Sequence, residues 1–462
     1  MMDLKISEII NALNGKMLQG DKNILINGIS TDSRTIKKGE LFIPLKGNNY
    51  DGERFLGDAL KIAAAALTAN EKNKKLITYD KPLIYVRDTF EALHKLSRYY
   101  RDKFNIPVIA VTGSSGKTTT KDMIHAVLSK KFNVLKTEGN FNNEIGLPLT
   151  IFKLNKFHQV AVIEMGMSGF GEIKTLKDIS NPDIAVFTNI GVAHIEKLSS
   201  RENILKAKSE LIEDFTTENT IVINADDDML IKLLNKKDVQ FYTYGIRNGD
   251  YRAYDIIQFE GGLRYKFKTP FESMNVELSI PGIHNVYNSM AAICIGLKFN
   301  VKKEDIVKAL REFKPGKMRL NIINTGKIKI IDDVYNANPD SMKAAISVLR
   351  EMKQRRKIAV LGDMLELGDY SDKGHRDIGE YVYISGIDIL ITIGNLAEKI
   401  AEAAQNSGMA KDNIYICSSN TEAIDILKGK IRNNDVILVK GSRGKKMEEI
   451  VEYLKGDYER IT

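Results

Sequence analysis

Short apolar runs alternate with amphipathic stretches along most of the chain. Four runs in its middle part have the pattern of buried strands, namely Val108–Val111, Val160–Ile163, Ile184–Phe187 and Thr220–Ile223. The stretches between them, such as Thr118–Lys130, carry their apolar residues on one helical face. Strands that alternate with amphipathic helices predict an α/β fold with a parallel sheet.

The two ends of the chain repeat this alternation. Before residue 105, Leu41–Leu45 and Leu83–Val86 are strand candidates and Phe90–Tyr100 is amphipathic. After residue 315 the strand candidates are Ile328–Ile331, Lys357–Leu361, Ile387–Ile393, Asn413–Cys417 and Val436–Val439. Helical patterns at Ser341–Lys353, Leu396–Gln405 and Thr421–Ile431 separate these runs. The last part is therefore expected to be a small Rossmann-like domain. The stretch Gln240–Ile280 has short alternating segments and is expected to be antiparallel.

Two turn-prone segments divide the chain into three. Pro107 disfavours helix at the residue before it, and Phe313–Gly316 has the composition of a linker. We expect a small N-terminal α/β domain at 1–104, a central phosphate-loop domain that binds a mononucleotide at 105–314, and a C-terminal Rossmann-like domain at 315–462. The length of 462 residues fits about three domains.

Composition narrows the function classes. The net charge is +8, but the lysines are spread along the chain and form no basic stripe with interleaved aromatics. This favours anionic small-molecule substrates over nucleic acid. The two cysteines are far apart, which fits a reducing compartment. We see no signal peptide and no uninterrupted apolar run of about 18 residues, so a cytoplasmic protein without a membrane span is expected.

The segment Thr112–Thr120, sequence TGSSGKTTT, follows one predicted strand and opens a helix. In that context it predicts a loop that holds phosphates, with backbone N–H groups of Gly113, Ser114, Ser115, Gly116 and Thr119 around the oxygens. Lys117 would pair with the β- and γ-phosphates, and the Thr118 hydroxyl would bind Mg²⁺. The usual pattern has a glycine where this chain has Val111. The alternative is a glycine- and serine-rich loop that binds nothing.

Several polar residues stand at the ends of predicted strands. Glu164 is a candidate Mg²⁺ ligand, since Mg²⁺ prefers oxygen, or else a partly exposed strand-end carboxylate. His194 follows another strand, where side chains line a common crevice, although a lone histidine is more often structural. Lys208 lies on a predicted helix, and the residues alone favour a surface lysine there.

Three further segments carry polar groups that suit a nucleotide. His284–Asn288 has side chains able to bind an adenine edge, or it is a helix N-terminal cap. Arg319 follows the second linker and is placed to reach across a domain interface. Asp332–Asp333 and the loop Tyr335–Pro339 follow a predicted strand and either accept from ribose hydroxyls or form a turn.

Taken in order, these motifs resemble those of the Mur ligase family over nearly the whole chain. The segment Gly139–Pro148, sequence GNFNNEIGLP, resembles the family's loop beside the reacting phosphate. The resemblance implies catalytic roles for Lys117, Asn140, Asn143, His194 and Lys208. It also implies that Thr118, Glu164, His194 and Lys208 surround Mg²⁺, with Lys208 carrying a carbamate formed from CO₂.

The same resemblance assigns the substrate contacts. It places Asn288 near the adenine, Arg319 near the phosphates, and Asp333 with Asn336 near the ribose. The N-terminal segments resemble a domain that binds a UDP-sugar, with contacts implied for Ser30, Thr31, Ser33, Arg34, Asn48 and Asn49.

Motifs in the last domain indicate which branch of the family is closest. The Asp-Asn-Pro-Arg motif of the branch that adds a diamino acid is missing from the sequence. The segments Asp333–Met342, Leu361–Gly368 and Val439–Arg443 resemble the branch that adds D-alanyl-D-alanine. This implies an ADP-forming ligase, monomeric, that uses ATP and Mg²⁺ to join D-alanyl-D-alanine to a UDP-N-acetylmuramoyl-tripeptide through an acyl phosphate. The alternatives are a diamino-acid-adding ligase of the family and a non-catalytic nucleotide-binding module.

Overall fold

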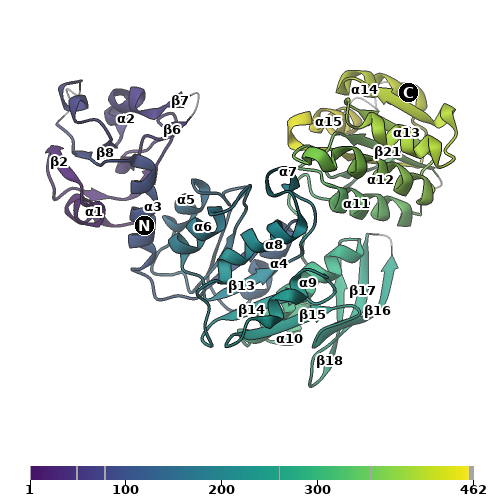
Figure 1. The fold of residues 1–462 in the computed structure, drawn as a ribbon, viewed down its shortest axis with the longest axis horizontal. Helices are drawn as coiled ribbons and strands as arrows, with labels where there is room; N and C mark the ends of the chain where they lie inside the picture. The colour runs from purple at the N-terminus through teal and green to yellow at the C-terminus, as the bar shows by residue number, and fades with distance from the viewer. Residues whose placement is uncertain (1, 48–49, 77–79, 260, 354–355, 457–462) are drawn as a thin grey trace.

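The computed structural model describes residues 2–47, 50–76, 80–259, 261–353 and 356–456. The chain forms three α/β lobes, with the central lobe between the N-terminal and C-terminal ones (Figure 1). The three-domain α/β architecture expected from the hydrophobic pattern is confirmed. The element α3 ends at Arg101 and the next strand begins at Val108, while α10 ends at Arg311 and the next strand begins at Asn321. Domain boundaries at 104 and 314 therefore fall between elements and remain predictions.

The N-terminal domain is built on a five-stranded sheet of order β2-β9-β8-β5-β4. Its strands are β2 (Lys16–Gln19), β9 (Leu83–Tyr85), β8 (Ala65–Thr68), β5 (Glu40–Phe42) and β4 (Gly28–Ser30), and only β2 runs antiparallel to its neighbour. Two short antiparallel pairs accompany it, β1 (Leu4–Lys5) with β3 (Leu25–Ile26) and β6 (Lys46–Gly47) with β7 (Tyr50–Asp51). The helices are α1 (Ile6–Leu13), α2 (Leu56–Ile62) and α3 (Thr89–Arg101).

The central domain holds a nine-stranded sheet of order β11-β12-β10-β13-β14-β15-β16-β17-β18. Its parallel part comprises β11 (Val134–Lys136), β12 (Val160–Glu164), β10 (Val108–Thr112), β13 (Ile184–Phe187), β14 (Thr220–Asn224) and β15 (Gln240–Gly245). The helices are α4 (Lys117–Leu128), α5 (Gly146–Ile151), α6 (Glu172–Ser180), α7 (Ile195–Leu198), α8 (Arg201–Ser209), α9 (Ile283–Lys298) and α10 (Lys303–Arg311). The strands β10, β12, β13 and β14 are buried throughout, which explains their continuous apolar runs.

The segment Gln240–Ile280 corrects one expectation. Only β16 (Tyr251–Phe259), β17 (Gly262–Lys268) and β18 (Ser273–Leu278) form antiparallel pairs. The strand β15 pairs in parallel with both β14 and β16. A crossover through the short helical segment Leu230–Asn235 returns the chain to the edge from which β14 started, so β15 enters the sheet in the same direction.

The C-terminal domain has a six-stranded sheet of order β19-β20-β24-β21-β22-β23. The strands are β19 (Asn321–Asn324), β20 (Lys329–Asp332), β24 (Asp435–Lys440), β21 (Arg356–Gly362), β22 (Ile389–Ile393) and β23 (Ile414–Cys417), all parallel except β19. Its helices are α11 (Pro339–Glu351), α12 (Ser371–Ile384), α13 (Glu398–Asn406), α14 (Asn420–Lys430) and α15 (Glu448–Gly456). The expected Rossmann-like topology is confirmed.

The apolar cores join the central domain closely to the N-terminal domain and less extensively to the C-terminal domain. One core runs from Leu4 and Ile6 of the N-terminal domain to Leu147 and Ile163 of the central domain, because α3 packs on α1, α5 and α6. The C-terminal domain has its own cores, joined to the central domain at Val192. No helix within the described ranges is long and apolar enough to cross a bilayer.

Candidate active site

A cavity of about 580 Å³ lies between the central and C-terminal domains. Its central-domain wall includes the predicted residues Ser114, Ser115, Gly116, Lys117, Thr118, Thr119, Asn140, Asn143, Glu164, His194 and Asn288. Its C-terminal wall includes the predicted residues Arg319, Asp333 and Asn336. The register of the central sheet explains why the central-domain residues lie close together. Val111 of β10 lies opposite Glu164 of β12, and Thr112 lies opposite Phe187 of β13, so three carboxyl ends align at one edge.

The phosphate loop takes a conformation that two glycines make possible. Gly113 has φ +148°, and a Cβ there would lie 1.9 Å from Thr188 Oγ1. Gly116, with φ +79°, directly precedes α4, and a Cβ there would lie 2.6 Å from Asn288 Oδ1. Both positions exclude a larger residue for steric as well as conformational reasons.

The loop after β13 braces the phosphate loop from behind. Thr188 Oγ1 donates to Ser115 O at 2.6 Å, and Asn189 Nδ2 donates to the same carbonyl at 3.0 Å. Ser115 N donates to Asn189 Oδ1 at 3.0 Å, and Gly191 N donates to Ser114 Oγ at 2.9 Å. The phosphate loop is thus preorganised by the protein itself.

Lys117 folds back over this loop. Its Nζ donates to Gly113 O at 2.9 Å, and the side chain faces the cavity. Burial lowers the pKa of Lys117, the nearby Glu164 carboxylate opposes that shift, and the positive charge of Arg319 adds to it. An anion entering the cavity would meet at least two cationic groups from different domains.

Glu164 has one buried carboxylate oxygen that accepts no hydrogen bond. Its Oε1 accepts from Asn142 Nδ2 at 2.8 Å, whereas Oε2 is buried without a hydrogen bond and lies 4.0 Å from Lys121 Nζ. A buried carboxylate oxygen without a hydrogen bond, in a cavity that Thr118 also lines, suits a hard divalent cation. The described residues hold no cluster of three or more His, Cys, Asp or Glu side chains around a metal position.

His194 is oriented by a carboxylate from the other domain. Its Nδ1 lies 2.7 Å from Glu366 Oε2, which leaves Nε2 as the second ring nitrogen. Both residues have positive φ, 63° for His194 and 65° for Glu366, an uncommon conformation for side chains of this size. The His194 contact lowers the pKa of Glu366.

Lys208 lies on α8 beneath the site and does not line the cavity. It is 1% exposed, so the interpretation as a surface lysine is wrong. Burial lowers the pKa of Lys208 well below its usual value, and the positive charge of Lys117 adds to this shift. The amine is therefore held toward its neutral form, which is the form that reacts with CO₂.

The predicted adenine and phosphate contacts come from α9 and the second linker. Asn288 Oδ1 accepts from Thr120 Oγ1 at 3.1 Å, and Asn288 Nδ2 donates to Asn285 Oδ1 at 3.1 Å. Asn288 therefore also supports the phosphate loop from below. The Arg319 guanidinium carbon lies 3.9 Å from the ring centroid of Tyr335, a cation–π contact within the cavity wall.

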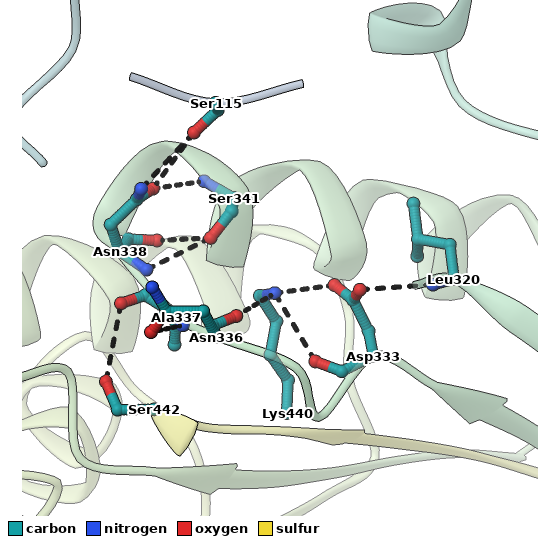
Figure 2. A network of polar contacts seen from close by, with 9 residues as sticks. All are labelled: Ser115, Leu320, Asp333, Asn336, Ala337, Asn338, Ser341, Lys440 and Ser442. Carbon is teal, nitrogen blue, oxygen red and sulfur yellow. Dashed lines mark hydrogen bonds and ion pairs between the residues drawn. The ribbon is translucent and has the colours of Figure 1, made fainter. Parts of the chain in front are cut away.

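The loop after β20 closes the cavity from the C-terminal side. Asp333 Oδ2 lies 2.6 Å from Lys440 Nζ, and Asp333 Oδ1 accepts from Leu320 N at 3.1 Å. Asn338 Nδ2 donates to Ser115 Oγ at 3.2 Å, a direct contact between the two domains (Figure 2). The loop therefore joins the nucleotide-facing wall to the phosphate loop.

The N-terminal candidates stand apart from this cavity. Ser30 ends β4, and Thr31, Ser33 and Arg34 follow it; Arg34 is exposed and forms an ion pair of 2.7 Å with Asp32. Asn48 and Asn49 lie outside the described residues. Their predicted contact with a UDP-sugar remains a prediction.

Sequence reasoning missed several residues that the fold brings to the site. Asn142 is the loop asparagine that contacts Glu164, although Asn140 and Asn143 had been singled out. The motifs that contain Glu366 and Lys440 indicate a branch of the family, but they do not predict that these two side chains line the cavity. The sequence signal available for Lys440 was a lysine placed directly after the apolar run Val436–Val439.

Comparison with known proteins places the chain in a family. Residues 25–101 match the Mur ligase family catalytic domain, residues 111–296 match the Mur ligase middle domain, and residues 318–443 match the Mur ligase glutamate ligase domain. The chain belongs to the Mur ligase family.

Several relatives match the chain over nearly its full length. A UDP-N-acetylmuramoyl-tripeptide–D-alanyl-D-alanine ligase of Bacillus subtilis is 41% identical over 433 residues, 93% of each chain. A crystal structure of MurF from Acinetobacter baumannii has a TM-score of 0.90 and 32% identity, covering 98% of this chain and 99% of that one. MurF ligase from Thermotoga maritima in complex with ADP has a TM-score of 0.83 and 30% identity, covering 94% and 98%.

Proposed function

We propose that this chain joins D-alanyl-D-alanine to UDP-N-acetylmuramoyl-tripeptide, with ATP converted to ADP and phosphate, in the synthesis of peptidoglycan precursors. The observation that carries the proposal is the cavity in which the phosphate loop of one domain faces the Asp333–Asn338 loop of another. Relatives of this name extend over 93% or more of the chain, and all three domains are therefore represented.

The reaction has two chemical steps. The terminal carboxylate of the tripeptide attacks the γ-phosphorus of ATP, the bond to the bridging oxygen breaks, and ADP leaves. The amine of D-alanyl-D-alanine then attacks the carbonyl carbon of the acyl phosphate, inorganic phosphate leaves, and the amine loses a proton. A carboxylate alone is a poor acylating agent, and phosphorylation gives it a leaving group.

The protein contributes mainly position and charge. The loop amides and Lys117 hold the phosphates, and Arg319 adds a second positive charge from across the cavity. These groups offset the repulsion between two anions that must approach each other. Alignment of bound reactants accounts for about 7–11 kcal/mol of a barrier in favourable cases.

Thr118, Glu164 and His194 are the residues that would hold Mg²⁺. Glu164 Oε2 is the buried oxygen without a hydrogen bond, and Thr118 and His194 line the same cavity. When bound, Mg²⁺ neutralises phosphate charge during transfer. Lys208 would carry a carbamate, whose formation needs the neutral amine that its buried position favours.

The remaining assignments follow from this activity. The UDP end of the substrate would bind the N-terminal domain around Ser30–Arg34, and the enzyme would work as a cytoplasmic monomer. Because the C-terminal domain keeps its own cores, we expect closure around Pro315–Gly316 when substrates bind. The shared core makes the linker at Asn105–Pro107 the stiffer of the two.

An acceptor screen tests the proposal. Purified protein is given ATP, Mg²⁺ and either UDP-N-acetylmuramoyl-tripeptide or UDP-N-acetylmuramoyl-dipeptide, and phosphate release is followed with D-alanyl-D-alanine, meso-diaminopimelate or lysine as the amine. We expect release with D-alanyl-D-alanine. Release with a diamino acid and UDP-N-acetylmuramoyl-dipeptide instead would assign the chain to another branch. Nucleotide binding without acceptor-dependent release would indicate a non-catalytic module.

A further inference from the structure

Lys440 ends β24 as a buried ammonium group within the cavity wall. The residue is 1% exposed and lies beside Asp333, because β24 and β20 are parallel neighbours with Val439 opposite Asp332. Figure 2 shows its Nζ between Asp333 and Asn336. The distances are 2.6 Å to Asp333 Oδ2 and 2.9 Å to Asn336 O.

The ammonium group of Lys440 binds the loop that follows β20. A lysine that lines a nucleotide cavity would ordinarily be interpreted as a phosphate ligand. Of its three N–H donors, two are used by Asp333 Oδ2 and Asn336 O, and Asp333 O lies 3.5 Å away. Both partners belong to residues 333–338, which we call the bridge loop.

The bridge loop is anchored at both ends by groups that matter for nucleotide binding. At one end, Asp333 Oδ1 accepts from Leu320 N, the residue after Arg319. At the other end, Asn338 caps α11 by accepting from Ser341 N at 2.9 Å and also contacts Ser115 of the phosphate loop. Lys440 holds the middle of a segment that links Arg319 to the phosphate loop.

We propose that Lys440 is a positioning residue, which fixes the bridge loop so that Asp333 faces the nucleotide and Asn338 docks on the phosphate loop. This inference rests on the proposed ATP-dependent ligation. Lys440 acts through the loop and makes no contact with phosphate. Because Asp333 is expected to face the ribose, which ATP, ADP and AMP share, the loss of Lys440 weakens the binding of all three nucleotides.

The test compares nucleotides of different charge. Dissociation constants for ATP, ADP and AMP are measured by displacement of a fluorescent nucleotide from wild type, Lys440→Met and Lys440→Arg. For Lys440→Met we expect all three constants to rise by a common factor of about ten, as after loss of one charge-assisted hydrogen bond. Lys440→Arg should recover part of the affinity, since its guanidinium still pairs with Asp333. Lys399→Met, which removes a surface ion pair with Glu402 on α13, is the matched control.

Steady-state kinetics and a second variant distinguish a positioning role of Lys440 from a general loss of protein stability. In Lys440→Met the KM for ATP should rise and kcat should fall, while the KM for the UDP-linked substrate stays near that of wild type. Asn338→Ala should reproduce part of the effect, and in the Lys440→Met background it should add little, because one loop carries both contacts. If Lys440→Met does not fold, Lys440→Arg and Asn338→Ala are compared in the same way.

Three outcomes overturn the inference. Unchanged nucleotide constants in Lys440→Met would show that the loop needs no anchor. A loss confined to ATP and ADP would show that Lys440 acts at the phosphates and does not position Asp333. Fully additive effects of Lys440→Met and Asn338→Ala would show that the two contacts act independently. Absence of ligation by the wild-type protein would instead reject the proposed function, which keeps the two failures distinguishable.

Discussion

Replacement of Gly113 by alanine should damage the phosphate loop in a way that can be divided into two parts. The first part is conformational, since φ is +148° at this position. A side chain in such a sparsely populated region costs about 1–3 kcal/mol. The second part is steric, because the new Cβ would lie 1.9 Å from Thr188 Oγ1. Thr188 must then move and release its hydrogen bond to Ser115 O, which is worth about 1 kcal/mol.

Together these contributions amount to about 2–4 kcal/mol against the loop conformation seen here. If nucleotide binding requires that conformation, the dissociation constant for ATP should rise by about 30- to 900-fold. Titration with a fluorescent ATP analogue measures the constant, and circular dichroism confirms that the fold is retained.

A second-site change tests the geometric reasoning. Thr188→Ala removes the oxygen at 1.9 Å and leaves the next atom, Thr188 Cβ, at 3.1 Å. Gly113→Ala combined with Thr188→Ala should therefore bind ATP more tightly than Gly113→Ala alone. Gly326→Ala is the control, since Gly326 also has positive φ but has open space around its Cβ position and lies in the turn between β19 and β20. Wild-type affinity in Gly113→Ala, or no recovery in the double variant, would refute the argument.

Three further predictions concern buried charges. Lys208→Ala should nearly abolish turnover, with partial rescue by short-chain carboxylates; full activity without rescue would remove the carbamate from the mechanism. Burial lowers the pKa of His125 from 6.5 to about 4. Between pH 6.5 and pH 4 the unfolded chain therefore binds a proton at His125 that the folded chain does not bind, and acid favours unfolding. Stability should be full above pH 6.5 and decline toward pH 4, and thermal melts of His125→Gln should show a smaller decline; equal profiles would contradict this. Arg101 donates to three carbonyls, Ser180 O, Phe104 O and Ile106 O, so Arg101→Met should lose about 2–4 kcal/mol in urea unfolding, whereas Lys95→Met should change stability by less than about 0.5 kcal/mol.

The hydrophobic pattern predicted β10, β12, β13 and β14 of the central domain and the parallel strands of the C-terminal domain within one or two residues, but it missed β11. The strand expected at Val108–Val111 runs from Val108 to Thr112, and the one expected at Val160–Ile163 runs to Glu164. These strands are buried on both faces, so their composition alone distinguishes them from solvent-exposed elements. The direction of β15 was not predictable in this way, because pairing direction depends on the path of the connection rather than on residue type.

The residues of the candidate site also differ in whether the local sequence predicts them. The residues of the phosphate loop could be recognised locally, because a glycine-rich turn between a strand and a helix commonly binds phosphate. The position of Glu164 followed from its place at the end of a predicted parallel strand. Lys208 could not be recognised from its neighbours in sequence. Its pKa depends on burial beneath the site and on the charge of Lys117, which lies 91 positions earlier in the chain.

The sequence by itself determined which segments become strands and helices, that a phosphate loop precedes α4, and the family to which the motifs belong. These properties depend on residues close together in the chain. Only the tertiary structure decided that Asn338 meets Ser115, that Glu366 orients His194, and that Lys440 supports the bridge loop. Such contacts join residues more than 100 positions apart. The first two exist because two separately folded domains meet at one cavity, and the third exists because β24 and β20 are neighbours in the C-terminal sheet.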